Sequence, residues 1–147
     1  MPSEDIFTLT AREEIEIAVR LVLAALFGAA VGYGGEAPIN PRGFEHCLWW
    51  LVAGGFALFT IVSAFGFETA DQSRVAAQIV TGVGFLGAGT ILRSGTSISG
   101  LTTTATIWAT ATIGMAAGSG LYIASIGGTA LMLAILYLFA PARNSDE

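Results

Sequence analysis

Charged residues are scarce in this chain. Lysine is absent, so all six basic residues are arginines, and Lys, Arg, Asp and Glu together make up 12% of the 147 residues. Soluble domains carry about 25% charged residues. Here 54% of the residues are hydrophobic, and the mean hydropathy is +0.72. The dispersed arginines and the net charge of −5 disfavour nucleic acid as a partner. These scarcities predict an integral membrane protein that contacts the lipid bilayer along most of its length.

The chain has a single cysteine and a single histidine. Cys47 cannot form a disulfide within the chain, and beside an apolar segment it is expected to behave as a small hydrophobic residue. His46 has only Glu36 and Glu45 near it in the sequence, so we expect an interfacial polar side chain there and no bound metal. Motifs of zinc proteases, Walker sites, dinucleotide sites and nucleophile elbows are also missing. We therefore expect no enzymatic activity and no cofactor.

Long apolar runs are abundant. Five of them approach the roughly 20 residues that cross a bilayer, and they cover residues 15–33, 47–67, 75–92, 101–117 and 121–140. The predicted fold is all-α, a polytopic membrane bundle of about five transmembrane helices. Residues 1–14 form an acidic lead-in, residues 15–140 the transmembrane domain, and residues 141–147 a short polar tail.

Two features bear on how the helices are arranged. The connection Gly118-Ser119-Gly120 is so short that the fourth and fifth helices must form a tight antiparallel hairpin, unless only four segments cross. Trp49 and Trp50 open the second run, and their rings are predicted to mark a membrane surface because tryptophan favours the headgroup boundary.

Glycines occur at helical spacing in two of the runs. A glycine in an apolar helix lets a neighbouring backbone approach closely. We therefore predict glycine-mediated helix packing at six positions: Gly28, Gly32, Gly82, Gly84, Gly87 and Gly89.

A polar strip leads from the loop before the third run into that run. Asp71 and Ser73 are candidate N-caps. Arg74 and Gln78 are four residues apart, so they share one helix face. Polar groups at membrane depth usually point into the bundle or into a wet cavity. The cluster Asp71, Arg74 and Gln78 is therefore interpreted either as a functional site between helices or as a set of structural hydrogen bonds.

Other polar residues are further candidates. Arg93 is predicted at the far end of the third helix, where a cation complements the helix dipole. Arg20 follows Glu16 by four residues, which predicts a structural ion pair. Six threonines in the fourth run can bond to carbonyls of their own helix or bridge to a neighbour, and a threonine-lined water path is the alternative: Thr102, Thr103, Thr104, Thr106, Thr110 and Thr112.

Several of these motifs follow one another along the chain. Asp71-Gln72-Ser73-Arg74-Val75-Ala76-Ala77-Gln78 leads into Gly82-Val83-Gly84-Phe85-Leu86-Gly87-Ala88-Gly89 and Ile91-Leu92-Arg93, and then into Gly100-Leu101-Thr102-Thr103 with Ala105, Thr106, Trp108 and Ala109. This succession resembles the MgtC/SapB family of bacterial membrane proteins. The family's hallmark is D-x-x-R-x-A-x-Q, followed by G-x-G-F-L-G-A-G and G-L-T-T-A-x-x-W-A.

The resemblance implies a multi-pass protein of the inner (plasma) membrane, associated with adaptation to low magnesium and survival inside host cells. Some family members are linked to restraint of the proton-driven ATP synthase, which implies a regulator. Thr102, Thr103 and Trp108 become candidate site residues because they lie in the family motif. Many members also carry a soluble domain after the last helix, and we expect this chain to lack it because only a few residues follow Pro141.

The segment Tyr33 to Cys47 departs from the family pattern. Family members have a basic run here, whereas this segment has Glu45 at the position of a family arginine. In the family this loop is cytoplasmic, so by analogy the N-terminus lies outside and the C-terminus inside. The altered loop is expected to meet a different partner.

The leading functional hypothesis is a non-enzymatic protein that modulates or stabilises a larger membrane complex, as a homo-oligomer or with other membrane subunits. A first alternative is an ion pathway, in which Asp71, Arg74, Gln78 and the threonine face conduct Mg²⁺ or protons. A second alternative is an accessory subunit of a respiratory or photosynthetic complex.

Overall fold

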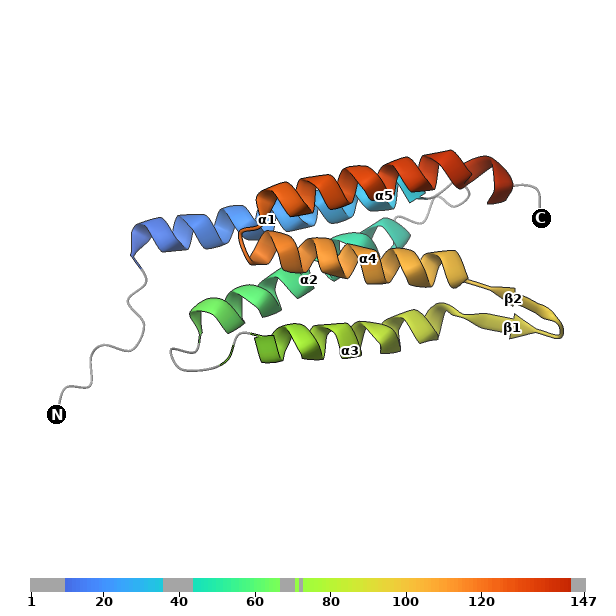
Figure 1. Cartoon of the computed structure of the whole chain (residues 1–147), viewed down its shortest axis with the longest axis horizontal. Helices are drawn as coiled ribbons and strands as arrows, with labels where there is room; N and C mark the ends of the chain where they lie inside the picture. Colours follow the sequence, from blue (N-terminus) through green and yellow to red (C-terminus); the bar gives the residue numbers. More distant parts are fainter. Residues whose placement is uncertain (1–9, 36–43, 67–70, 72, 144–147) are drawn as a thin grey trace.

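Five helices lie side by side in the computed structural model, which describes residues 10–35, 44–66, 71 and 73–143 (Figure 1). The elements in chain order are α1 Ala11–Gly35, α2 Phe44–Phe65, α3 Ser73–Thr90, β1 Leu92–Ser94, β2 Ser97–Ser99, α4 Leu101–Gly118 and α5 Tyr122–Arg143. Successive helices run in opposite directions, so α1, α3 and α5 begin at the end of the bundle where α2 and α4 finish. The predicted all-α bundle of about five helices is confirmed.

Three helices are long and apolar enough to cross a membrane by length and composition. They are α1 over Ala11–Gly34, α2 over Cys47–Phe65 and α5 over Tyr122–Phe139. The other two, α3 and α4, have 18 residues each, which corresponds to about 27 Å of helix. Their glycines and threonines lower their hydropathy, because these residues replace large aliphatic side chains.

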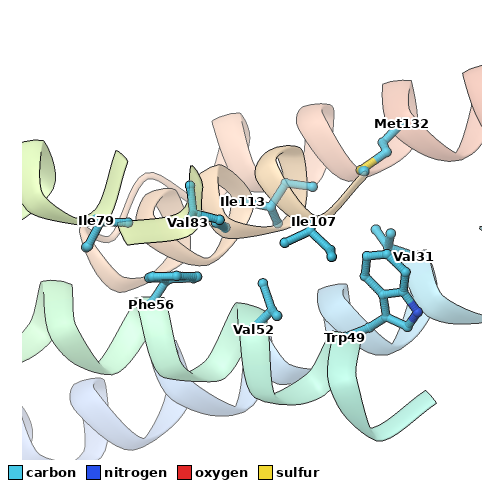
Figure 2. Close-up of a cluster of buried hydrophobic side chains, with 10 residues drawn as sticks. Val31, Trp49, Val52, Phe56, Ile79, Val83, Ile107, Ile113 and Met132 are labelled. Carbon is cyan, nitrogen blue, oxygen red and sulfur yellow. The ribbon is translucent and has the colours of Figure 1, made fainter. Parts of the chain in front are cut away.

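The hydrophobic core draws on all five helices. It contains Val31 of α1, three residues of α2, two of α3, three of α4 and Met132 of α5 (Figure 2). The central helix is α4, because it contacts each of the other four. By contrast, α3 packs chiefly on α4 and has a smaller contact with α2. Thus α4 is surrounded by the other helices, and α3 lies at an edge of the bundle.

Small residues bring three backbones together around Ala53 of α2. A Cβ atom added at Gly28 of α1 would lie 2.7 Å from the Ala53 Cβ, and one added at Gly114 of α4 would lie 3.0 Å from the Ala53 Cα. One turn further along, Gly118 meets Ala57 in the same way, with 3.0 Å to the Ala57 Cα. Helices can approach this closely only where side chains are missing.

Trp49 is a core residue, which corrects the expectation that both tryptophans mark a membrane surface. Its side chain is 3% exposed and covers Gly32, where an added Cβ would lie 2.5 Å from the Trp49 Cδ1. Trp50 is 47% exposed. Adjacent residues on a helix point about 100° apart, so only one of the two rings can face the core.

A short β-hairpin replaces the end of the predicted third helix. After α3 ends at Thr90, β1 pairs antiparallel with β2, and Arg93 lies opposite Ile98. Gly95 turns the hairpin with φ +63°, and Gly100 precedes α4 with φ +87°. Because glycine readily adopts positive φ, these two residues let the chain turn within the hairpin and then enter α4.

The expected tight connection between α4 and α5 is present. Gly120 has φ +78°, its N–H donates to the Ala117 carbonyl at 3.0 Å, and the Leu121 N–H donates to the Ala116 carbonyl at 2.9 Å. This pair of bonds is a Schellman motif, which ends a helix and satisfies its last carbonyls. The chain therefore reverses within Ser119 to Leu121.

Candidate functional site

Asp71 caps the start of α3. The Ser73 N–H donates to Asp71 Oδ1 at 2.9 Å, and the Arg74 N–H donates to the Asp71 carbonyl at 3.1 Å. Bonds from the Ser73 hydroxyl and the Ser73 N–H lower the pKa of the Asp71 carboxyl from its ordinary value. The side chain is exposed, so among the two interpretations given to Asp71 its geometry favours capping.

Arg74 and Gln78 lie one turn apart on an exposed face of α3. Neither side chain makes a hydrogen bond or an ion pair to the residues that the structure describes. They share a face with each other, as their spacing predicts, but the structure does not bring them and Asp71 together around a cavity. These two polar groups therefore point away from the other helices that the structure describes.

Most of the exposed residues of α3 form a broad surface that we call the uncovered face of α3. Its members are small or polar apart from one phenylalanine: Arg74, Ala77, Gln78, Thr81, Gly82, Gly84, Phe85, Ala88 and Gly89. Two exposed aliphatic residues, Val80 and Leu86, flank this face. A Cβ added at Gly82, Gly84 or Gly89 would have no atom within 4 Å. Within one copy of the chain these three glycines pack against nothing described.

The opposite edge of α3 is tied to α4 through Gly87. An added Cβ there would lie 2.7 Å from Thr104 Cγ2, and the Thr104 hydroxyl is 2.9 Å from the Gly87 carbonyl and 2.8 Å from Thr90 Oγ1. Thr104 thus bridges two helices. The other threonine hydroxyls of α4 that form bonds use their own helix, as Thr110 does when it donates to the Thr106 carbonyl at 2.8 Å.

The surfaces of α1 and α5 provide a comparison for the uncovered face of α3. Many of their exposed residues are large and aliphatic, including Ile15, Val22, Leu26, Ile123, Ile126, Leu131 and Leu138. Such side chains suit contact with lipid tails. The uncovered face of α3 instead presents Arg74, Gln78, Phe85 and a set of residues with little or no side chain, so it differs in chemistry from the exposed surfaces of α1 and α5.

Arg20 joins three helices at the end of the bundle where α3 begins. Its Nη1 donates to the Gly118 carbonyl at 2.9 Å, its Nη2 pairs with Glu16 Oε1 at 2.5 Å, and its guanidinium lies 5.4 Å from the centre of the Phe65 ring. The predicted ion pair with Glu16 is confirmed. Gly118 is the last residue of α4, so Arg20 also supplies a donor and a positive charge to the negative end of that helix.

A cavity of about 140 Å³ adjoins Arg20. Thr60 and Ser63 of α2, Ser119 and the first turn of α3 contribute to its walls, and no threonine of α4 does so. Thr60 and Ser119 donate their hydroxyl protons to carbonyls of neighbouring residues, Phe56 and Met115. Arg20 Nε is buried without a partner among the described residues. This space can hold ordered water at a polar end of the bundle.

The remaining candidates are spread over the molecule. Thr102 and Thr103 are exposed in the first turn of α4, and Trp108 is 46% exposed two turns later. Arg93 is exposed in β1, where its Nε donates to the Gly95 carbonyl at 3.3 Å, and so it is not at a helix end. The side chain of His46 lies outside the described residues. Within the described ranges, no three His, Cys, Asp or Glu side chains come together as metal ligands.

Two features were missed in the sequence. Gly114 and Gly118 have the same four-residue spacing as Gly28 and Gly32, and that spacing is the signal that could have found them. Arg20 was assigned only a local partner, because its contact with Gly118 crosses 98 positions and has no sequence signature.

Comparison with known proteins places this arrangement among relatives. The model of the MgtC family matches residues 21–145. The chain is 45% identical over 132 residues to a protein of Escherichia coli named "Putative magnesium transporter YhiD", covering 84% of this chain and 60% of the relative. No solved structure matches the chain.

Two further relatives are similar over the same region. Identity to SapB of Bacillus subtilis is 41% over 116 residues, covering 73% of this chain and 49% of SapB. Identity to MgtC of Brucella abortus is 37% over 123 residues, covering 80% of this chain and 49% of that protein. The chain thus spans about half to three fifths of the length of these relatives. Since the family model extends over nearly all of the described bundle, this chain belongs to the MgtC family.

Proposed function

We propose that this chain is a non-enzymatic membrane protein that modulates or stabilises a larger membrane complex, and that the uncovered face of α3 is its contact surface. The supporting observation is the chemical contrast between this face and the exposed faces of α1 and α5. Large aliphatic side chains are frequent on α1 and α5, whereas the uncovered face of α3 presents an arginine, a glutamine, several glycines and a single large apolar residue, Phe85.

The cost of leaving Gln78 against lipid supports a protein partner. Gln78 is five residues beyond Ser73, so it lies about 7.5 Å along the helix axis from the start of α3. An amide in hydrocarbon without a hydrogen-bond partner costs about 4–8 kcal/mol relative to water. A helix packed on the uncovered face would offer Gln78 a partner and would exclude lipid from the glycines.

The proposed setting is magnesium homeostasis at the inner (plasma) membrane, with all five helices crossing. The name of YhiD links that relative to magnesium transport, and we extend only the link to magnesium to this chain. The proposal concerns the transmembrane part that this chain shares with its longer relatives.

An ion pathway for Mg²⁺ or protons is the second candidate, and the cavity beside Arg20 is the observation that favours it. Arg20 would repel Mg²⁺ there. None of Asp71, Arg74 and Gln78 lines this cavity. We therefore rank the pathway below the contact surface.

Site-specific photo-crosslinking in native membranes tests the contact surface. A photoreactive residue at Ala77 or Thr81 is expected to trap a membrane protein in stoichiometric amounts, and one at Ile126 of α5 is expected to trap lipid. Equal protein adducts at both sites, or lipid adducts alone at α3, would refute the proposal.

Liposomes containing the purified chain test the pathway. We expect no Mg²⁺ or proton flux above that of empty vesicles. Flux that disappears in Gln78→Leu would favour the pathway instead.

A further inference from the structure

We infer that the occupant of the uncovered face of α3 is a transmembrane helix of another protein, with a carboxylate side chain near the membrane surface at which α3 begins. This inference rests on the proposed function, because it specifies the chemistry of the partner at the same surface. The juxtaposition that carries it is a cation, Arg74, and an amide, Gln78, neither of which has a partner among the described residues, beside the small residues that continue the same face.

Arg74 supplies the charge that calls for a carboxylate. It is the second residue of α3 and is exposed, and it has no ion pair among the described residues. The nearest described carboxylate in sequence is Asp71, whose Oδ1 already accepts from the Ser73 N–H. A guanidinium beside an apolar helix surface is stabilised by an opposite charge at short range, since the local dielectric is low.

Beside the exposed ring of Phe85, one side of the face has the shape for close helix contact. Ala77, Thr81, Gly84 and Ala88 follow one another at spacings of four, three and four residues, so they form one ridge of small side chains. All four are exposed. Gln78 flanks this ridge one turn below Arg74, where its amide can both donate to and accept from a partner helix.

A second copy of this chain fits the face less well. In a twofold dimer through α3 the two helices would be parallel and symmetry-related residues would meet. Arg74 would then face Arg74 of the other copy, and two like charges would be held together in a medium of low dielectric. A partner with a carboxylate at this level removes the repulsion, so the charge pattern favours a different protein.

Lipid alone would also leave polar groups of the uncovered face without hydrogen-bond partners. An anionic headgroup can pair with Arg74, but the acyl chains below it offer no hydrogen bond to Gln78 and do not fill the space beside Gly84. The combination of cation, amide and small ridge therefore points to a helix.

Energy transfer between the whole labelled chain and synthetic transmembrane peptides tests the inference. The peptides are leucine helices with one alanine and glycine stripe, identical except for a Glu, Gln or Lys near one end, in vesicles of phosphatidylcholine. We expect the Glu peptide to associate about two to five times more tightly than the Gln peptide, in the range that single exposed charge pairs give. The Lys peptide should associate most weakly.

Charge reversal makes the test specific. The variant Arg74→Gln should abolish the preference for the Glu peptide, and Arg74→Glu should transfer it to the Lys peptide. The matched control is Arg93→Gln, which removes the same charge from the hairpin at the opposite end of the bundle. For the ridge, Gly84→Leu should weaken association with every peptide, whereas Gly127→Leu on α5 should not, although both glycines have open space beside them.

Three outcomes would overturn the inference. The first is equal association of all three peptides. The second is energy transfer between copies of the chain that Gly84→Leu removes, which would make a second copy the occupant. The third is a combined result: added phosphatidylglycerol removes the preference for the Glu peptide, and Gln78→Leu does not change peptide association. That result would mean that Arg74 binds lipid headgroups. If the inference fails while crosslinking at Ala77 in native membranes persists, the contact surface itself stands.

Discussion

At the scale of single residues, Arg20 connects three helices at the polar end of the bundle. Its guanidinium reaches the last carbonyl of α4, the Glu16 carboxylate and the Phe65 ring from a side chain that is 13% exposed. Gly120 permits this arrangement, because an added Cβ would lie 2.9 Å from Arg20 Nη2. Arg20 therefore links the start of α1 to the ends of α2 and α4.

We predict that Arg20→Gln destabilises the protein by about 1.5–3 kcal/mol, the range for hydrogen bonds that involve a charged group. Thermal unfolding in detergent measures the change. Arg12→Gln is the control, since Arg12 is exposed at the start of α1, and its effect should stay within about 0.5 kcal/mol. An equal shift for both variants would contradict the role assigned to Arg20.

Asp71 allows a prediction with a defined pH dependence. Its pKa is lowered in the folded state, so its capping contribution is complete above the ordinary aspartate pKa and is lost as the pH falls through the lowered value. Asp71→Ala should therefore speed amide hydrogen exchange at Ser73 and Arg74 near neutral pH and have no effect in strong acid. Asp71→Asn, which keeps an acceptor, should show slow exchange at both pH values.

At the scale of elements, α3 is the least enclosed helix. Its buried residues are Ile79, Val83 and Gly87, of which Gly87 packs against Thr104 of α4, and most of its other residues are exposed. The glycines of α3 therefore fall into two groups: Gly87 faces α4, while Gly82, Gly84 and Gly89 face away from the described chain.

Leucine substitutions separate these two groups. Gly87→Leu should destabilise the isolated protein by about 1–3 kcal/mol or more, because overpacking displaces Thr104. Gly84→Leu should leave its unfolding unchanged and should act only on association. Thr110→Val is a mild reference, because it removes a hydroxyl that bonds within its own helix. Unfolding of purified Gly84→Leu at a clearly lower temperature would show that α3 is covered within one copy.

At the scale of the whole molecule, the alternating helices place the start of α1 and the hairpin at opposite ends (Figure 1). By analogy with the family, we expect the hairpin to be cytoplasmic and α3 to begin on the outer side of the membrane. The end of α3 that carries Arg74 is then expected to lie toward the outside.

Cysteine labelling in intact cells checks this orientation. In a Cys47→Ser background, Thr10→Cys should react with an impermeant maleimide added outside, and Ser97→Cys should react only after the membrane is opened. Both positions are exposed, so access depends on the side of the membrane. Labelling of Ser97→Cys from outside would reverse the orientation.

The number and approximate positions of the helices could be predicted from the sequence, because hydrophobic length and glycine spacing are local properties. It also predicted the pair of Glu16 and Arg20, which are four residues apart on one helix. The burial of Trp49 and the end of α3 could not be predicted from the sequence. Neighbouring elements decide which tryptophan ring is buried and where a hairpin replaces a helical turn.

The sequence by itself determined that this is a membrane bundle of about five helices with small residues at their contacts, since chain composition sets what a bilayer accepts. Only the tertiary structure decided which contacts form. Gly114 rests on Ala53, Arg20 reaches Gly118, and α3 is left with one polar face open. The physical reason is that close packing around α4 has room for only one side of α3, and the side it takes is the one carrying Ile79, Val83 and Gly87.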